Sequence, residues 1–198
     1  MTNSWQATFR IVLHAVIGII VLALLLHTWA VMGLVVPVAI HGDSMEPTLP
    51  RGSHVIVDRA AYLWHQPKRW DVVVFRCPTK ANELCVKRIV GLPGETISLA
   101  GGQVLVEGKP LSGNVQYEMR YQDWAAFWAR HGNSAPQKVK WQLGENEYFV
   151  LGDHSAVSDD SRSWSHGPGL PAALLVGKAL GVGRADGEVP GKPTYLSR

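Results

Sequence analysis

The sequence predicts a mostly β domain of antiparallel strands behind a single N-terminal membrane-spanning helix. Three observations lead to this prediction. Arg10 is the only charged residue before Asp43, so residues 43–198 carry 34 of the 35 charges. From Val55 onward, short runs of β-branched residues alternate with turn residues. The 8 Trp and the lack of any low-complexity tract exclude disordered, collagen-like and coiled-coil chains.

The apolar run over residues 11–36 is long enough to cross a membrane. Of its 26 residues, 21 are apolar and none carries a fixed charge. As a helix it would be about 39 Å long, which exceeds the hydrocarbon core of a bilayer, about 30 Å. A secretory signal peptide needs only a shorter apolar core. A cleavable signal is the alternative, because residues 36–39 faintly resemble a processing site.

The charges that flank this run predict its orientation. Arg10 and the chain's amino group lie on its short side, and the first charges after it are Asp43 and Glu46. Positive charge favours the cytoplasmic side of a membrane. We therefore expect residues 1–10 to be a short cytoplasmic N-terminus, residues 11–36 a transmembrane helix and residues 37–198 an extracytoplasmic β-rich domain.

Seven runs of apolar and β-branched residues are predicted to be the strands of this domain. They cover residues 55–57, 72–75, 86–90, 96–99, 104–106, 148–151 and 174–182. Pro93 and Gly94 occupy the second and third positions of a predicted type II turn. The clearest helix outside the membrane is predicted at residues 121–131. This pattern is typical of an antiparallel β domain with little helix.

The two cysteines, Cys77 and Cys85, bracket a predicted hairpin turn. Paired strands bring such positions within reach of a disulfide, and an exported domain allows oxidation. Two buried free thiols are the alternative. Two cysteines without further His or Cys nearby do not make a zinc site.

Aromatic side chains gather around the predicted helix of residues 121–131, and they are Trp124, Phe127, Trp128 and Trp141. Packing against the sheet is the favoured interpretation, and docking at the membrane interface is the alternative. The net charge of +3 is small and dispersed. No basic stripe with interleaved aromatics occurs, so we expect no nucleic-acid partner.

Two segments carry candidate reactive groups. Ser44 lies in GDSMEPTL, residues 42–49, a segment that begins six residues after the apolar run. Ser44 fits either an exposed nucleophile or an ordinary loop serine. Lys87 and Arg88 lie inside the apolar segment VKRIVGLPGE, residues 86–95. Strand alternation places the two bases on opposite faces, both of them apolar, so spacing alone leaves open which one is buried.

A third segment, GDHSAVSDDSR at residues 152–162, is rich in polar groups. If its backbone is extended, Ser158, Asp160 and Arg162 share one side, which places a hydroxyl beside a carboxylate–guanidinium pair. The alternative is a solvated polar loop.

Together, in this order and after a single membrane span, these segments resemble the type I signal peptidase (leader peptidase) family, the serine/lysine membrane proteases. The resemblance covers most of the chain and includes Val176–Ala179 near its end. It implies a signal-peptidase-like β fold and the removal of signal peptides from exported preproteins. It also implies a catalytic domain held on the extracytoplasmic side of the bacterial cytoplasmic (inner) membrane, with the lipid bilayer as a partner and no metal or organic cofactor.

The resemblance assigns roles to residues of this chain. Ser44 would be the nucleophile and Lys87 the general base. Ser158 would orient the lysine, while Asp160 and Arg162 would support the site. The positions that line the family's substrate cleft correspond to Ile40, Met45, Leu49, Val55 and Val86. The chain departs from the family at several places around these motifs, and they are Gly42, Gly52, Ser53, His154 and Ser155.

The proposed chemistry sets a requirement on Lys87. A lysine acts as a base only when it is neutral, and its reference pKa is about 10.4. Burial in an apolar site lowers a lysine pKa by up to about 3–5 units. The valine- and isoleucine-rich strand around Lys87 is therefore expected to exclude water.

Three other functions remain as alternatives. A Ser/His/Asp hydrolase is the nearest rival, because the chain has 8 His and Asp153–His154 adjoin the third segment. A specialised processing peptidase for a single exported substrate, such as a conjugative pilin, uses similar motifs. A non-catalytic membrane-anchored module that binds signal peptides is the third.

Overall fold

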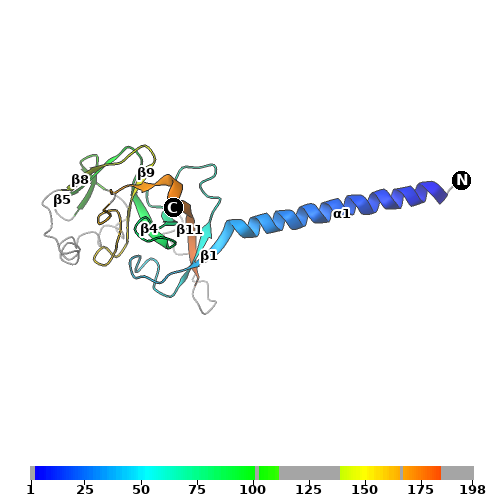
Figure 1. Cartoon of the computed structure of the whole chain (residues 1–198), viewed down its shortest axis with the longest axis horizontal. Coiled ribbons are helices and arrows are strands. Elements are labelled where there is room, and N and C mark those ends of the chain that lie inside the picture. The colour runs from blue at the N-terminus through cyan, green and yellow to red at the C-terminus, as the bar shows by residue number, and fades with distance from the viewer. Residues whose placement is uncertain (1–2, 101–102, 112–138, 166, 184–198) are drawn as a thin grey trace.

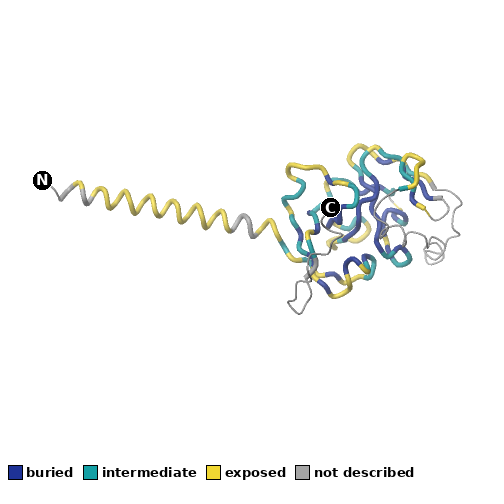
Figure 2. The backbone as a smooth tube through the Cα atoms, turned by 180° about the vertical axis from the view of Figure 1, so that it is seen from behind, coloured by how far each residue is buried: buried dark blue, intermediate teal, exposed yellow. Residues whose placement is uncertain are grey.

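The computed structural model describes residues 3–100, 103–111, 139–165 and 167–183. It begins with one long helix, α1 (Asn3–Leu34), which projects from the β domain and is exposed wherever its side chains are described (Figures 1 and 2). Within it, Thr8–Thr28 is long and apolar enough to cross a membrane. The predicted helix at residues 121–131 and its aromatic residues Trp124, Phe127 and Trp128 lie outside the described residues.

The helix ends earlier than the apolar run does. Val35 and Val36, predicted to be helical, belong instead to strand β1 (Val35–Ala39), which pairs with β2 (His54–Asp58). The cause is Pro37, because the residue before a proline is driven out of the helical region into extended backbone. At the other end α1 begins at Asn3, so it includes most of the predicted N-terminal segment.

The strands form two antiparallel sheets. The larger has the order β1-β2-β11-β3-β4-β9-β10 and adds β3 (Val72–Arg76), β4 (Leu84–Gly91), β9 (Glu147–Leu151), β10 (Leu170–Pro171) and β11 (Leu175–Gly183). The smaller has the order β7-β6-β5-β8, from β5 (Thr96–Ala100), β6 (Gln103–Val106), β7 (Lys109–Pro110) and β8 (Val139–Gln142). A short 3-10 helix, η1 (Ala172–Leu174), precedes β11.

The predicted mostly β, antiparallel fold is therefore confirmed. Six of the seven predicted strand runs lie entirely in strands, and the seventh, residues 174–182, does so except for Leu174, which belongs to η1. Strands β1, β7, β8 and β10 were not predicted. Two of these four have only two residues and contain a proline, which leaves no alternating pattern to detect. Figure 1 shows β5 and β8 at the end of the domain opposite α1.

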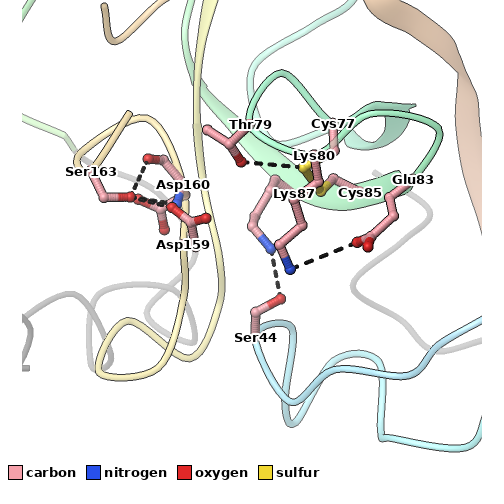
Figure 3. Close-up of a disulfide and its surroundings, with 10 residues drawn as sticks. All are labelled: Ser44, Cys77, Thr79, Lys80, Glu83, Cys85, Lys87, Asp159, Asp160 and Ser163. Atoms are coloured by element: carbon pink, nitrogen blue, oxygen red, sulfur yellow. Dashed lines mark hydrogen bonds and ion pairs between the residues drawn. A yellow bond between two sulfur atoms is a disulfide. The ribbon is translucent and has the colours of Figure 1, made fainter. Parts of the chain in front are cut away.

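The hairpin of β3 and β4 is closed by a disulfide. Cys77 and Cys85 are bonded, with their Cα atoms 5.1 Å apart, and the Cys77 N–H donates to the Glu83 carbonyl at 2.9 Å. The disulfide predicted from the spacing is confirmed. Because Cys85 and Lys87 are two residues apart on one strand, the cross-link secures the hairpin beside the lysine (Figure 3).

Candidate active site

The side chains of Ser44 and Lys87 are in contact, although one comes from a loop and the other from an interior strand of the larger sheet. Ser44 lies in the turn-rich loop between β1 and β2, and Lys87 lies in the middle of β4. The Lys87 Nζ is 2.6 Å from the Ser44 Oγ, and Figure 3 shows the two side chains pointing at each other. This hydrogen bond joins two residues that are 43 positions apart in the chain.

Lys87 is buried, with only 5% of the residue exposed. Val73 faces it on β3, and valines and an isoleucine fill the same strand. Burial lowers the pKa of Lys87 below its ordinary value, against the attraction of the Asp160 and Asp159 carboxylates, which acts to raise it. A lysine of this kind is poised to act as a base.

Arg88, the neighbour of Lys87, is buried as well, so both faces of the strand bury a base. Its side chain is fully buried and makes a two-pronged ion pair with Asp153, at 2.8 Å from Nε to Oδ1 and 2.7 Å from Nη2 to Oδ2. The Thr48 hydroxyl donates to the same carboxylate. This network ties β4 to the loop after β9 and to the loop that carries Ser44.

The segment of residues 152–162 is a series of bends and turns, not an extended strand. It still forms the predicted ion pair, with the Arg162 Nε and Nη2 each 2.6 Å from an oxygen of Asp160. Burial alone would raise the pKa of Asp160, but the Arg162 guanidinium and the Gly152 N–H hold that pKa below its ordinary value. The carboxylate is therefore charged and fixed close to the lysine.

The same segment holds the Ser44 loop through its backbone. The His154 N–H donates to the Ser44 carbonyl at 3.0 Å. Ser158 is fully buried, and its Oγ has no hydrogen-bond partner within the part of the chain that the structure describes. The predicted contact of Ser158 with Lys87 is therefore not among the hydrogen bonds of these described residues.

The five predicted substrate-binding residues all lie in one buried cluster. Val86 and Ile40 keep 9% and 6% of their surface exposed, Met45 keeps 1%, and Leu49 and Val55 keep none. Their side chains pack together beside the Ser44 loop. The structure thus brings these residues to the site and leaves Val86 and Ile40 as the two with the most accessible surface.

Comparison with known proteins identifies the family. The model of the signal peptidase family, peptidase S26, matches residues 13–182. This chain belongs to that family. It is an enzyme of signal peptidase I type, a serine endopeptidase.

Several signal peptidases are similar to this one. A signal peptidase I from Leptolyngbya laminosa is 34% identical over 170 residues, which cover 81% of this chain and 72% of that protein. A signal peptidase I from Bacillus licheniformis is 34% identical over 162 residues, 82% of each chain. The crystal structure of a signal peptidase I from Enterococcus faecalis V583 aligns with a TM-score of 0.42 and 26% identity, over 58% of this chain and 97% of that one.

The buried ion pair of this signal peptidase escaped the sequence analysis. Alternation along β4 left Arg88 facing valines, with no indication of a partner 65 residues away. One signal was available, because a buried guanidinium requires a carboxylate and the Gly-Asp of residues 152–153 supplies one. Among the described residues, no group of three or more His, Cys, Asp or Glu could hold a metal ion.

Gly152 is expected to be essential for the fit between the loop that carries Ser44 and the loop that carries Ser158. A Cβ at this position would lie 2.2 Å from the Ser158 Oγ and 2.5 Å from the Ser44 carbonyl oxygen. We predict that Gly152→Ala lowers kcat about 100-fold, because a shift of about 1 Å in a catalytic group can cost that much. The measurement is peptide cleavage by the purified full chain.

The matched control is Gly181→Ala, since a Cβ there meets nothing within 4 Å. It should leave kcat near the wild-type value. Equal activity of the two variants would contradict the tight fit around Gly152.

Proposed function

We propose that this peptidase removes N-terminal signal peptides from exported preproteins, with Ser44 as nucleophile and Lys87 as general base. The observation that carries the proposal is the 2.6 Å contact between the Ser44 Oγ and the Nζ of a buried lysine. A nucleophile within hydrogen-bond reach of its base is the geometry that serine proteolysis requires. By contrast, no described hydrogen bond joins a histidine side chain to Ser44, as a Ser/His/Asp mechanism needs.

The reaction proceeds in two stages. Neutral Lys87 takes the proton of the Ser44 hydroxyl while Oγ attacks the scissile carbonyl carbon. The Lys87 ammonium then gives its proton to the leaving amine, the C–N bond breaks, and the acyl group remains on Oγ as an ester. Lys87 next takes a proton from water, the hydroxide attacks the ester, and Oγ leaves with that proton.

The neighbouring residues support this pair. The Asp160–Arg162 pair fixes the loop whose residue 154 N–H holds the Ser44 carbonyl. The buried Ser158 Oγ has no hydrogen-bond partner among the described residues, which supports its proposed role in orienting Lys87. The buried apolar residues around Ile40 and Val86 favour small side chains before the cleaved bond, because little space is open there.

We further propose that α1 spans the bacterial cytoplasmic membrane, with its N-terminus in the cytoplasm and the β domain on the other side. The single long apolar helix and the flanking Arg10 support this arrangement. Ser44 follows the end of α1 by ten residues. The nucleophile thus stays near the bilayer surface, where a membrane-held signal peptide presents its cleavage site.

The direct test is mass spectrometry of the new N-terminus after incubating the purified full chain with a panel of unrelated preproteins. Cleavage after the signal peptide in most of them, lost in Ser44→Ala, supports a general signal peptidase. Cleavage of only one substrate would establish the dedicated processing peptidase instead. Binding without cleavage would leave only the non-catalytic module.

The pH dependence of kcat should report on Lys87. Because the base must be neutral, kcat is expected to rise with pH through the pKa of Lys87, which burial sets below its ordinary value. The Asp159 carboxylate acts to raise this pKa, so Asp159→Asn should move the rising limb to lower pH. The measurement is kcat against pH for both proteins. A limb that moves to higher pH, or no movement, would contradict Lys87 as the base.

A further inference from the structure

The carboxylate of Asp159 differs from the other carboxylates beside Ser44 and Lys87. Nearby aspartates are in ion pairs, and they are Asp43 with Arg51, Asp153 with Arg88 and Asp160 with Arg162. Asp159 is exposed, and it forms no ion pair within the part of the chain that the structure describes. Its negative charge is therefore available to a charged group of a substrate.

The loop of residues 152–162 brings Asp159 close to the reacting groups. Its neighbour Ser158 lies next to the backbone of Ser44, since a Cβ on Gly152 would be 2.2 Å from the Ser158 Oγ and 2.5 Å from the Ser44 carbonyl oxygen. Burial lowers the pKa of Lys87, and the Asp159 carboxylate is one of the charges that act to raise it. Figure 3 shows Asp159 and the disulfide on opposite sides of Lys87.

The side chain of Asp159 is held in place although it is exposed. The Ser163 hydroxyl donates to the Asp159 Oδ1 (Figure 3). The same hydroxyl oxygen accepts the Asp160 N–H at 3.2 Å, so the backbone of the loop fixes Ser163 in turn. A carboxylate that is already ordered loses little conformational freedom when it binds a cation, and this favours selective recognition.

The sheet topology places Asp159 on the side of the leaving group. The apolar cluster proposed to receive the residues before the cleaved bond is built from the Ser44 loop and strands β2, β3, β4 and β11. The loop of residues 152–162 follows β9, which pairs with the other edge of β4. Lys87 lies between the two on β4, and in the proposed reaction it protonates the leaving amine. The residues after the cleaved bond therefore pass Lys87 toward Asp159.

We propose that Asp159 binds a basic side chain within the first three residues after the cleaved bond and so selects among exported preproteins. This inference rests on the proposed function of Ser44 and Lys87. Three extended residues span about 10 Å, similar to the distance over which a charge acts before salt screens it, about 8 Å at physiological ionic strength. A lysine or arginine there is attracted and a glutamate is repelled, so the two kinds of substrate are cleaved at different rates.

The test compares peptides that share one cleavage sequence and carry lysine, glutamine or glutamate at a single position after the cleaved bond. The measurement is kcat/KM of the purified full chain in detergent micelles at low salt. At the most sensitive of the three positions, we expect the lysine peptide to be cleaved about fivefold faster than the glutamate peptide, with glutamine between them. High salt should bring this ratio toward one, because ions screen charges at the surface.

Two substitutions isolate the contribution of the Asp159 carboxylate. Asp159→Asn should bring the lysine-to-glutamate ratio to about one, and Asp159→Lys should reverse the preference. Both also lower the pKa of Lys87, but this change affects every peptide alike and cancels in the ratio. Glu145→Gln is the matched control, because Glu145 is exposed at the other end of β9 and the substitution removes the same charge. It should leave the ratio unchanged.

The outcomes distinguish this inference from the proposed function. If the peptides are cleaved at the expected bond but the wild type and Asp159→Asn have the same ratio, the binding role of Asp159 is wrong and the proposed function stands. If Glu145→Gln changes the ratio as much as Asp159→Asn does, the effect comes from net charge and not from a local contact, which also overturns the inference. If no peptide is cleaved, the proposed function fails and the inference fails with it.

Discussion

Lys87→Met is expected to reduce kcat for signal-peptide cleavage about 10³-fold or more. Methionine is similar to lysine in length and suits a buried site, so the loss should come from the missing base and not from a cavity. General-base catalysis contributes about 10²–10⁴-fold, and removal of one member of a catalytic unit disables the others. The measurement is steady-state cleavage of a preprotein by the full chain.

Two comparisons make this prediction specific. The double variant Ser44→Ala/Lys87→Met should be no slower than either single variant, because the proposed mechanism has Ser44 and Lys87 share one proton. Lys80→Met is the matched control, since Lys80 is exposed on the turn of the same hairpin and pairs only loosely with Glu83, at 3.7 Å (Figure 3). It should retain wild-type activity. Multiplicative losses in the double variant would show that the two residues act independently.

Arg88→Met is expected to lower the free energy of unfolding by about 3–5 kcal/mol. The substitution leaves the Asp153 carboxylate buried without its guanidinium partner, which is costly in a site that water does not reach. The measurement is the urea midpoint of the full chain in detergent micelles. Activity should fall as well, because the same network holds Thr48 in the Ser44 loop.

A double variant distinguishes the loss of the attraction between Arg88 and Asp153 from the cost of leaving the Asp153 carboxylate buried without a partner. Arg88→Met/Asp153→Asn removes both charges and should recover part of the lost stability. Arg51→Ala is the exposed counterpart, because Arg51 and Asp43 form an ion pair with 63% and 43% of their side chains exposed. Its midpoint should stay close to that of the wild type. An equal loss in Arg88→Met and Arg51→Ala would contradict a buried, unscreened network.

Local pattern predicted most of the fold. The strands that carry the site, such as β3 and β4, contain several β-branched residues in succession, and this signal does not depend on the partner strand. The predicted end of the membrane helix, at residue 36, was wrong because Val35 and Val36 suit both a membrane helix and a strand. Pro37 decides between the two, and its effect is visible only once the following residues are recognised as a strand.

The site was predictable to the extent that it depends on residue type in a motif. Ser44 and Lys87 were placed together through the resemblance, and the structure brings their side chains into contact. The Arg88–Asp153 pair and the close approach at Gly152 depend on how loops from three parts of the chain pack, and no local periodicity encodes that. The turns of residues 152–162 were missed for the same reason.

No loose linker separates α1 from β1, and this has a mechanical consequence. Strand β1 follows Leu34 directly and is clamped to β2 along its whole length of five residues, a rise of about 16 Å. With α1 across the membrane as proposed, the paired strand β1 is a rigid connection that fixes the distance of the domain from the lipid. The site is then held at a fixed distance from the membrane, which a flexible linker would not do. This fixed distance would select substrates by the number of residues between their apolar segment and their scissile bond.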